Sequence, residues 1–133
     1  MHEVQWRAFH QKRLHREALA EARIIHAKDP EILEALASGY AQGGYAEANR
    51  RAAEKLSARK NPNFWEQEHA AIYRAMAGQK SQALDWLERG YKTRHSMMSF
   101  IGVDPHWDLL RSEPRFRELM RKLKLPESPR PPA

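Results

Sequence analysis

The sequence predicts an all-α protein made of repeated helix pairs. Residues that favour helices, chiefly Ala, Glu, Arg, Leu, Lys and Gln, dominate the 133 residues, whereas β-branched residues are scarce. Gly and Pro interrupt the helix-favouring stretches at short intervals. Aromatic residues recur in these stretches, each followed at similar distances by small residues. Together these three observations indicate a single domain of helical hairpins.

Three aromatic residues begin the repeated units. The units run Phe9, Ala18, Ala22 and Ile25; Tyr40, Ala48, Ala52 and Leu56; and Tyr73, Ala83, Leu87 and Gly90. Small residues on the second helix of a pair let that helix pack close to the first. We therefore expect Phe9, Tyr40, Tyr73, Trp86 and Leu87 to be buried between neighbouring helices.

Glycine, proline and helix-capping residues mark where the expected helices begin and end. We expect helices near residues 3–13, 16–28, 31–42, 46–59, 63–77, 80–93, 96–101 and 113–124. Asp29-Pro30 closes the first pair, and Gly43-Gly44 and Gly78 supply turns in which a positive φ is commonly needed. The Asn61-Pro62-Asn63 segment opens the fifth helix with an Asn cap.

The C-terminal region also has capping residues followed by proline at the expected helix starts. Asp104-Pro105 begins a short helical turn, and Ser112 precedes Pro114 at the start of the last helix. The apolar residues from Trp107 to Leu123 predict a cap on the end of the stack. Residues 126–133 are rich in proline, so we expect a disordered tail.

The spacing of the three units resembles that of the tetratricopeptide repeat. In the first unit Arg13 stands where that family usually has glycine. The resemblance implies a right-handed α-solenoid of about three helix-turn-helix repeats with a C-terminal capping helix. The expected domain spans residues 1–125, with repeats at about 1–30, 31–60 and 61–95 and a cap at 96–125.

A more specific resemblance covers about residues 36–125. It rests on the segments Gly39-Tyr40-Ala41, Ala46-Glu47-Ala48, Ala71-Ile72-Tyr73, 83–91 (ALDWLERGY) and 103–116 (VDPHWDLLRSEPRF). These resemble a module at the C-terminal end of bacterial signalling proteins, among them winged-helix regulators, adenylate cyclases and serine/threonine kinases. The resemblance implies a non-enzymatic scaffold of bacterial signalling or regulation that docks a protein or peptide.

In this repeat family the first helix of each pair lines a concave groove. The resemblance therefore nominates seven groove residues: Arg7, His10, Glu34, Ser38, Gln42, Gln67 and Arg74. Their mixed charge and hydrogen-bonding capacity suits an extended peptide, whose backbone amide groups need partners.

The residue patterns give no support for catalysis, a metal or a cofactor. The chain has no cysteine, and no histidine pair has the i, i+4 spacing of a helical zinc site, so we interpret the seven histidines as exposed or capping. It contains neither a Gly-x-Ser-x-Gly segment nor a phosphate-binding loop. The four tryptophans are interpreted as core or inter-repeat packing.

The net charge of +6 leaves nucleic-acid binding as the alternative function. Positive charge collects in the expected fourth helix and at the C-terminal end, where basic residues flank the stripe formed by Phe116, Leu119, Met120 and Leu123. The same arrangement is expected without nucleic acid, because long basic side chains lay their aliphatic parts along a buried apolar stripe and keep their charged ends in water. We expect no membrane span and a cytoplasmic location, and a homodimer joined at the end of the stack is a further alternative.

Overall fold

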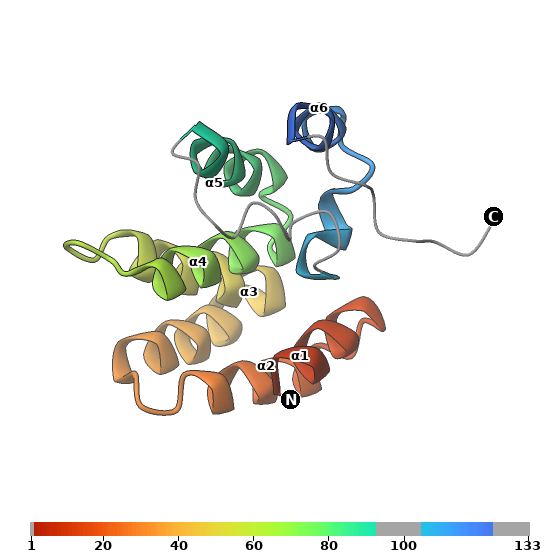
Figure 1. Ribbon diagram of the computed structural model, residues 1–133. Coiled ribbons are helices and arrows are strands. Elements are labelled where there is room, and N and C mark those ends of the chain that lie inside the picture. Colours follow the sequence, from red (N-terminus) through yellow and green to blue (C-terminus); the bar gives the residue numbers. More distant parts are fainter. Residues whose placement is uncertain (1, 93–104, 124–133) are drawn as a thin grey trace. The chain divides into compact units, whose positions relative to one another are not determined.

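The computed structural model describes residues 2–92 and 105–123, and every regular element among them is helical (Figure 1). The prediction of an all-α protein is thus confirmed for these residues. The chain forms two compact units, residues 1–79 and 80–133. The boundary between the units falls inside the third predicted repeat. The expected helix at 96–101, the Asp104 cap and the tail at 126–133 lie outside the described residues.

The first unit contains four helices: α1 (His2–Gln11), α2 (His15–Ile25), α3 (Pro30–Ser57) and α4 (Phe64–Met76). The second contains α5 (Lys80–Lys92), the 3₁₀ helix η2 (Pro105–Leu110) and α6 (Pro114–Leu123). Most boundaries lie within one to three residues of those expected. The exception is α3, which joins the expected helices 31–42 and 46–59 across Gly44.

Helices α1 and α2 form the first hairpin, and Figure 1 shows them side by side. Ala18 and Ala22 of α2 and Trp6 of α1 are fully buried, and Trp6 contacts His69 and Tyr73 of α4. The turn between them places Arg13 at φ 61°, in the left-handed region that glycine adopts most easily. The tetratricopeptide pattern that the sequence resembles usually has glycine where Arg13 stands, so this departure in sequence coincides with backbone strain.

A single residue divides α3 into two halves. Asp29 caps its N-terminus by accepting a hydrogen bond from the Ile32 N–H, and Pro30 occupies the first turn. Gly44 has φ 85° and ψ −164°, and the two halves run side by side in opposite directions (Figure 1). Gly39 packs directly on the second half, because a Cβ built at this position would lie 2.7 Å from the Cα of Ala48.

The small residues predicted to bring paired helices together are buried. Ala18, Ala22, Ala48, Ala52 and Ala83 are all fully buried, as are Leu56 and Leu87 at later positions of the pattern. This confirms the prediction that the small residues on the second helix of each predicted repeat are buried.

The predicted aromatic positions are only partly confirmed. Tyr73 and Leu87 are buried, and Phe9 and Trp86 are half-buried. The prediction was wrong for Tyr40, whose side chain is exposed. Gly39 occupies the face of α3 that meets Ala48, and the next residue is rotated by about 100° away from that contact. The buried aromatic residue of this hairpin is Tyr45, directly after the break.

Helix α4 packs on α3 and begins with a capping box. The Asn63 side chain accepts the Glu66 N–H at 2.8 Å, and the Glu66 carboxylate accepts the Asn63 N–H at 2.9 Å. The Asn cap expected at this position is thus confirmed. The buried face of α4 then contributes Ile72 and Tyr73 to the core of the first unit.

The second unit packs α5 and α6 against each other. Its buried residues include Leu84 and Leu87 from α5, Trp107 and Leu110 from η2, and Phe116, Leu119 and Met120 from α6. The two short elements begin at Pro105 and Pro114, as the cap-and-proline pattern predicts. The Arg111 guanidinium lies 5.7 Å from the centre of the Phe116 ring.

We expect the substitution Gly39→Ala to destabilise the first unit by about 2 kcal/mol, although alanine favours helices. Its Cβ would meet the backbone of Ala48 and Glu47, which cannot be relieved by a side-chain rotation. Urea unfolding followed by circular dichroism would measure the loss. Ala37→Ser at an exposed position of the same helix should change stability by less than about 0.5 kcal/mol.

We expect Arg13→Gly to stabilise the chain by about 0.5–1 kcal/mol. Glycine removes the cost of the left-handed conformation, and this gain exceeds the extra entropy of glycine in the unfolded chain. The midpoint of thermal unfolding should therefore rise. Asn61→Gly provides a comparison, because Asn61 has φ 55° but asparagine tolerates this region, so the gain there should be smaller. An equal or lower midpoint for Arg13→Gly would contradict the strain at this turn.

Candidate functional site

The seven predicted groove residues all remain accessible. They come from three helices: Arg7 and His10 from α1, Glu34, Ser38 and Gln42 from the first half of α3, and Gln67 and Arg74 from α4. Glu34, Gln42 and Gln67 are exposed, and the other four are half-buried. All seven belong to the first unit, so the candidate site can be described on that unit alone.

Four of these residues make contacts that orient their side chains. His10 contacts the Tyr45 hydroxyl at 2.7 Å, and Arg74 donates to the Ser57 hydroxyl at 3.1 Å. The Gln67 side chain donates to the Pro62 carbonyl at 2.9 Å. Gln42 accepts a hydrogen bond from Arg51 at 2.8 Å, which draws it toward the second half of α3.

An aromatic cluster forms at the His10 end of the candidate site. The rings of His15 and Tyr45 stack with centroids 4.0 Å apart, and His10 stacks on the same tyrosine at 5.6 Å. Burial lowers the pKa of His10, and the nearby His15 lowers it further. Burial also raises the pKa of Tyr45 to about 12, against a smaller opposite effect from Asn49. Both His10 and Tyr45 are therefore neutral at physiological pH.

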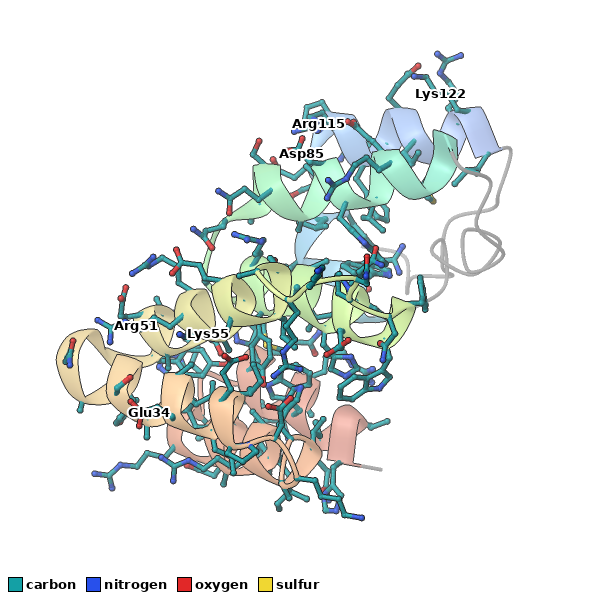
Figure 2. The ribbon with its side chains drawn as sticks, turned by 90° about the vertical axis from the view of Figure 1, so that its left-hand side faces the viewer. Glu34, Arg51, Lys55, Asp85, Arg115 and Lys122 are labelled. Carbon is teal, nitrogen blue, oxygen red and sulfur yellow. The ribbon has the colours of Figure 1, made fainter. Side chains whose placement is uncertain are left out.

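The second half of α3 carries a charged surface beside the candidate site. The Glu47 carboxylate pairs with both Arg50 and Arg51. Figure 2 shows Arg51 and Lys55 on this half and Glu34 on the first half. The Arg50 and Arg51 hydrogen bonds lower the pKa of Glu47 to about 2, so the pairing persists over the whole physiological pH range.

Arg59 connects three carboxylates around the start of α3 and the start of α4. Its guanidinium donates to Asp29 at 2.7 Å, to Glu31 at 3.2 Å and to Glu66 at 2.5 Å. The hydrogen bond from Arg59 is the main cause that lowers the pKa of Asp29 and of Glu66. The same two carboxylates cap α3 and α4, so Arg59 holds the two helix starts together.

The histidine and tryptophan interpretation was wrong at three positions. His26 and His69 are almost fully buried, although we expected exposed or capping imidazoles. Trp65, expected in the core, is 42% exposed. The reason is that the Trp65 and His69 rings lie on the same side of α4, 3.9 Å apart, with the histidine toward the core. No spacing signal in the sequence distinguishes these two histidines from the others.

Two of the basic residues of α6 form ion pairs within the second unit. Arg115 pairs with Asp85 at 2.6 Å and Glu88 at 2.7 Å, and Figure 2 shows Arg115 beside Asp85. Arg121 pairs with Glu118 on the same helix. These pairs neutralise part of the positive charge on which the nucleic-acid alternative depends.

The part of the chain that the structure describes contains no group of three or more histidine or acidic side chains that could hold a metal ion. Among the same residues, no helix combines the length and the apolar character needed to cross a membrane.

Comparison with known proteins gives no further guide to the site, because no protein-family model, curated protein or solved structure matches the chain.

We expect Arg59→Met to lower the free energy of unfolding by about 1–2 kcal/mol at pH 7, because three neighbouring carboxylates lose their common partner. The Asp29 and Glu66 pKa values are lowered in the folded chain, so this contribution is present above about pH 4 and disappears as acid protonates them. The difference between wild type and variant should shrink between pH 5 and 3. Urea unfolding at several pH values measures it, and a difference that is constant with pH would contradict the assignment.

Proposed function

We propose that this chain is a non-enzymatic interaction scaffold that binds an extended peptide or a peptide-like segment of a protein. The contact surface consists of Arg7, His10, Glu34, Ser38, Gln42, Gln67 and Arg74. The observation that carries the proposal is the accessibility of all seven polar residues on three helices of one compact unit.

The chemistry of these residues supports a peptide as the ligand. Peptide backbones present alternating N–H and C=O groups, and each such group loses its water partners on binding. Carboxylate, amide, hydroxyl and guanidinium groups can together replace both kinds of partner. A surface of this kind binds modestly, so we expect a dissociation constant in the micromolar range, on the order of −8 kcal/mol.

The helix packing supports a repeat scaffold as the frame for this surface. We propose that the α1–α2 hairpin and the two halves of α3 are successive tetratricopeptide-like repeats, and that α4 begins a third in a right-handed solenoid. The buried alanines at matching positions and the close contact of Gly39 with Ala48 support this assignment. In such stacks the first helices of successive pairs form one continuous surface. We further propose a role in bacterial signalling within the cytoplasm, on the resemblance alone.

The proposed surface predicts that charge reversal at Arg7 or Arg74 weakens peptide binding at least tenfold. Peptides selected from a random-sequence display library on the full-length chain provide the ligand, and fluorescence anisotropy measures its dissociation constant. Each substitution should leave the thermal midpoint nearly unchanged, because both side chains are accessible. Arg117→Glu on α6, an exposed position of the second unit, is the matched control and should bind normally.

The same assay distinguishes the nucleic-acid alternative. Phosphate binding by several cations should fall by orders of magnitude between low and moderate salt, whereas peptide binding on a mixed surface should change little. Tight, salt-sensitive binding of a labelled random oligonucleotide, weakened by Arg117→Glu but not by Arg7→Glu, would reject the peptide proposal. Selected peptides that bind both reversed variants and the wild type equally would also reject it.

A further inference from the structure

Two buried histidines lie where the first hairpin meets α4. Five rings form this histidine cluster: Trp6 from α1, His26 at the end of α2, and Trp65, His69 and Tyr73 from α4. The His26 and His69 rings meet edge to face at 5.5 Å, and Trp6 stacks on His69 at 6.0 Å. The cluster therefore joins α1 and α2 to α4 through aromatic contacts.

The hydrogen bonds of His26 suit a neutral ring. Its Nδ1 lies 2.9 Å from the Tyr73 hydroxyl, whereas its buried Nε2 has no hydrogen-bond partner in the described part of the chain. A protonated His26 would carry N–H donors at both ring nitrogens, and the donor at Nε2 would be buried without an acceptor. An unpaired charged donor is among the most costly groups to bury.

The charged groups around the cluster do not compensate such a charge. Asp29 at the start of α3 favours protonation of His26, and so does the Ala22 carbonyl, which already accepts the His26 backbone N–H. Arg59 at the end of α3 opposes it, and this guanidinium is itself paired with Asp29. The remaining titratable neighbours, His69 and Tyr73, supply no negative charge, because burial raises the pKa of Tyr73.

We propose that the histidine cluster is a pH-operated latch, which holds the α1–α2 hairpin on α4 while the His26 imidazole is neutral and releases the hairpin when that imidazole is protonated. The latch lies at the contact between the hairpin and α4, so its opening exposes Trp6 and the inner face of both helices. All five rings belong to the first unit, so we expect the helices of the second unit to stay folded when the latch opens.

The pKa of His26 indicates where the latch operates. Burial, and next the neighbouring His69, lower this pKa from 6.5 to about 4. The folded form is thus fully favoured above pH 6.5, and the advantage is lost as the pH falls from 6.5 toward 4. At pH 5 the equilibrium for opening should increase by about 30-fold relative to pH 7.5.

Hydrogen–deuterium exchange of the full-length chain, resolved by peptide mass spectrometry and corrected for the intrinsic pH effect, tests the latch. We expect peptides of α1 and α2 to lose protection by about 30-fold between pH 7.5 and 5, while those of α5 and α6 keep theirs. Equal loss in all helices would show general acid unfolding and would overturn the proposal.

Two variants assign the effect to the cluster. His26→Gln removes the titrating ring and should abolish most of the pH-dependent loss. His2→Gln, at an exposed position of α1 outside the cluster, should retain most of it. The reverse result would overturn the proposal. If His26→Gln does not fold, the NMR titration of the wild-type imidazoles decides: His26 must stay neutral until hairpin protection is lost, and protonation of a still-protected hairpin would refute the latch.

Discussion

The close approach of small residues is the constraint on which the first unit depends. The two halves of α3 meet where Gly39 faces the backbone of Ala48, at a distance that leaves no room for a side chain. Similar burial of Ala18 and Ala22 in the first hairpin keeps α1 and α2 close together. At this spacing the interior of each hairpin is filled by backbone and methyl groups, so the larger side chains must pack between hairpins. The aromatic residues at the contact with α4 follow from that requirement.

Arginine side chains join helices at two places in the described part of the chain. Arg59 connects two helix starts, and Arg115 connects α5 to α6. In these pairs the carboxylates offset the positive charge of the arginines, so the pairs themselves add nothing to the net charge of +6. What remains accessible on the first unit is a mixture of signs and neutral hydrogen-bonding groups. Recognition by such a mixture depends on the position of each group more than on long-range attraction.

The sequence was informative wherever a local rule governs the structure. Helix class, the cap at Asn63 and the burial of the alanines follow from capping, turn chemistry and spacing. The exposure of Tyr40 and Trp65 and the burial of His26 depend on how each helix is rotated, which spacing alone does not determine. For the candidate site, accessibility was predictable, because polar residues on helix faces tend to stay in water. The contacts of His10 and Gln42 with the second half of α3 were not, since they require the hairpin geometry.

The ion pair between Arg59 and Glu66 links the two sides of the connection between α3 and α4. Lys60 and Asn61 form an exposed connection, and the residues on either side of it are joined by the contact between Arg59 and Glu66. The end of α3 and the start of α4 are therefore linked twice, once covalently and once through space. A protease that cuts between these helices would leave two fragments still held together by packing and by this ion pair. The same position is suited to new chain ends in a circularly permuted form of the protein.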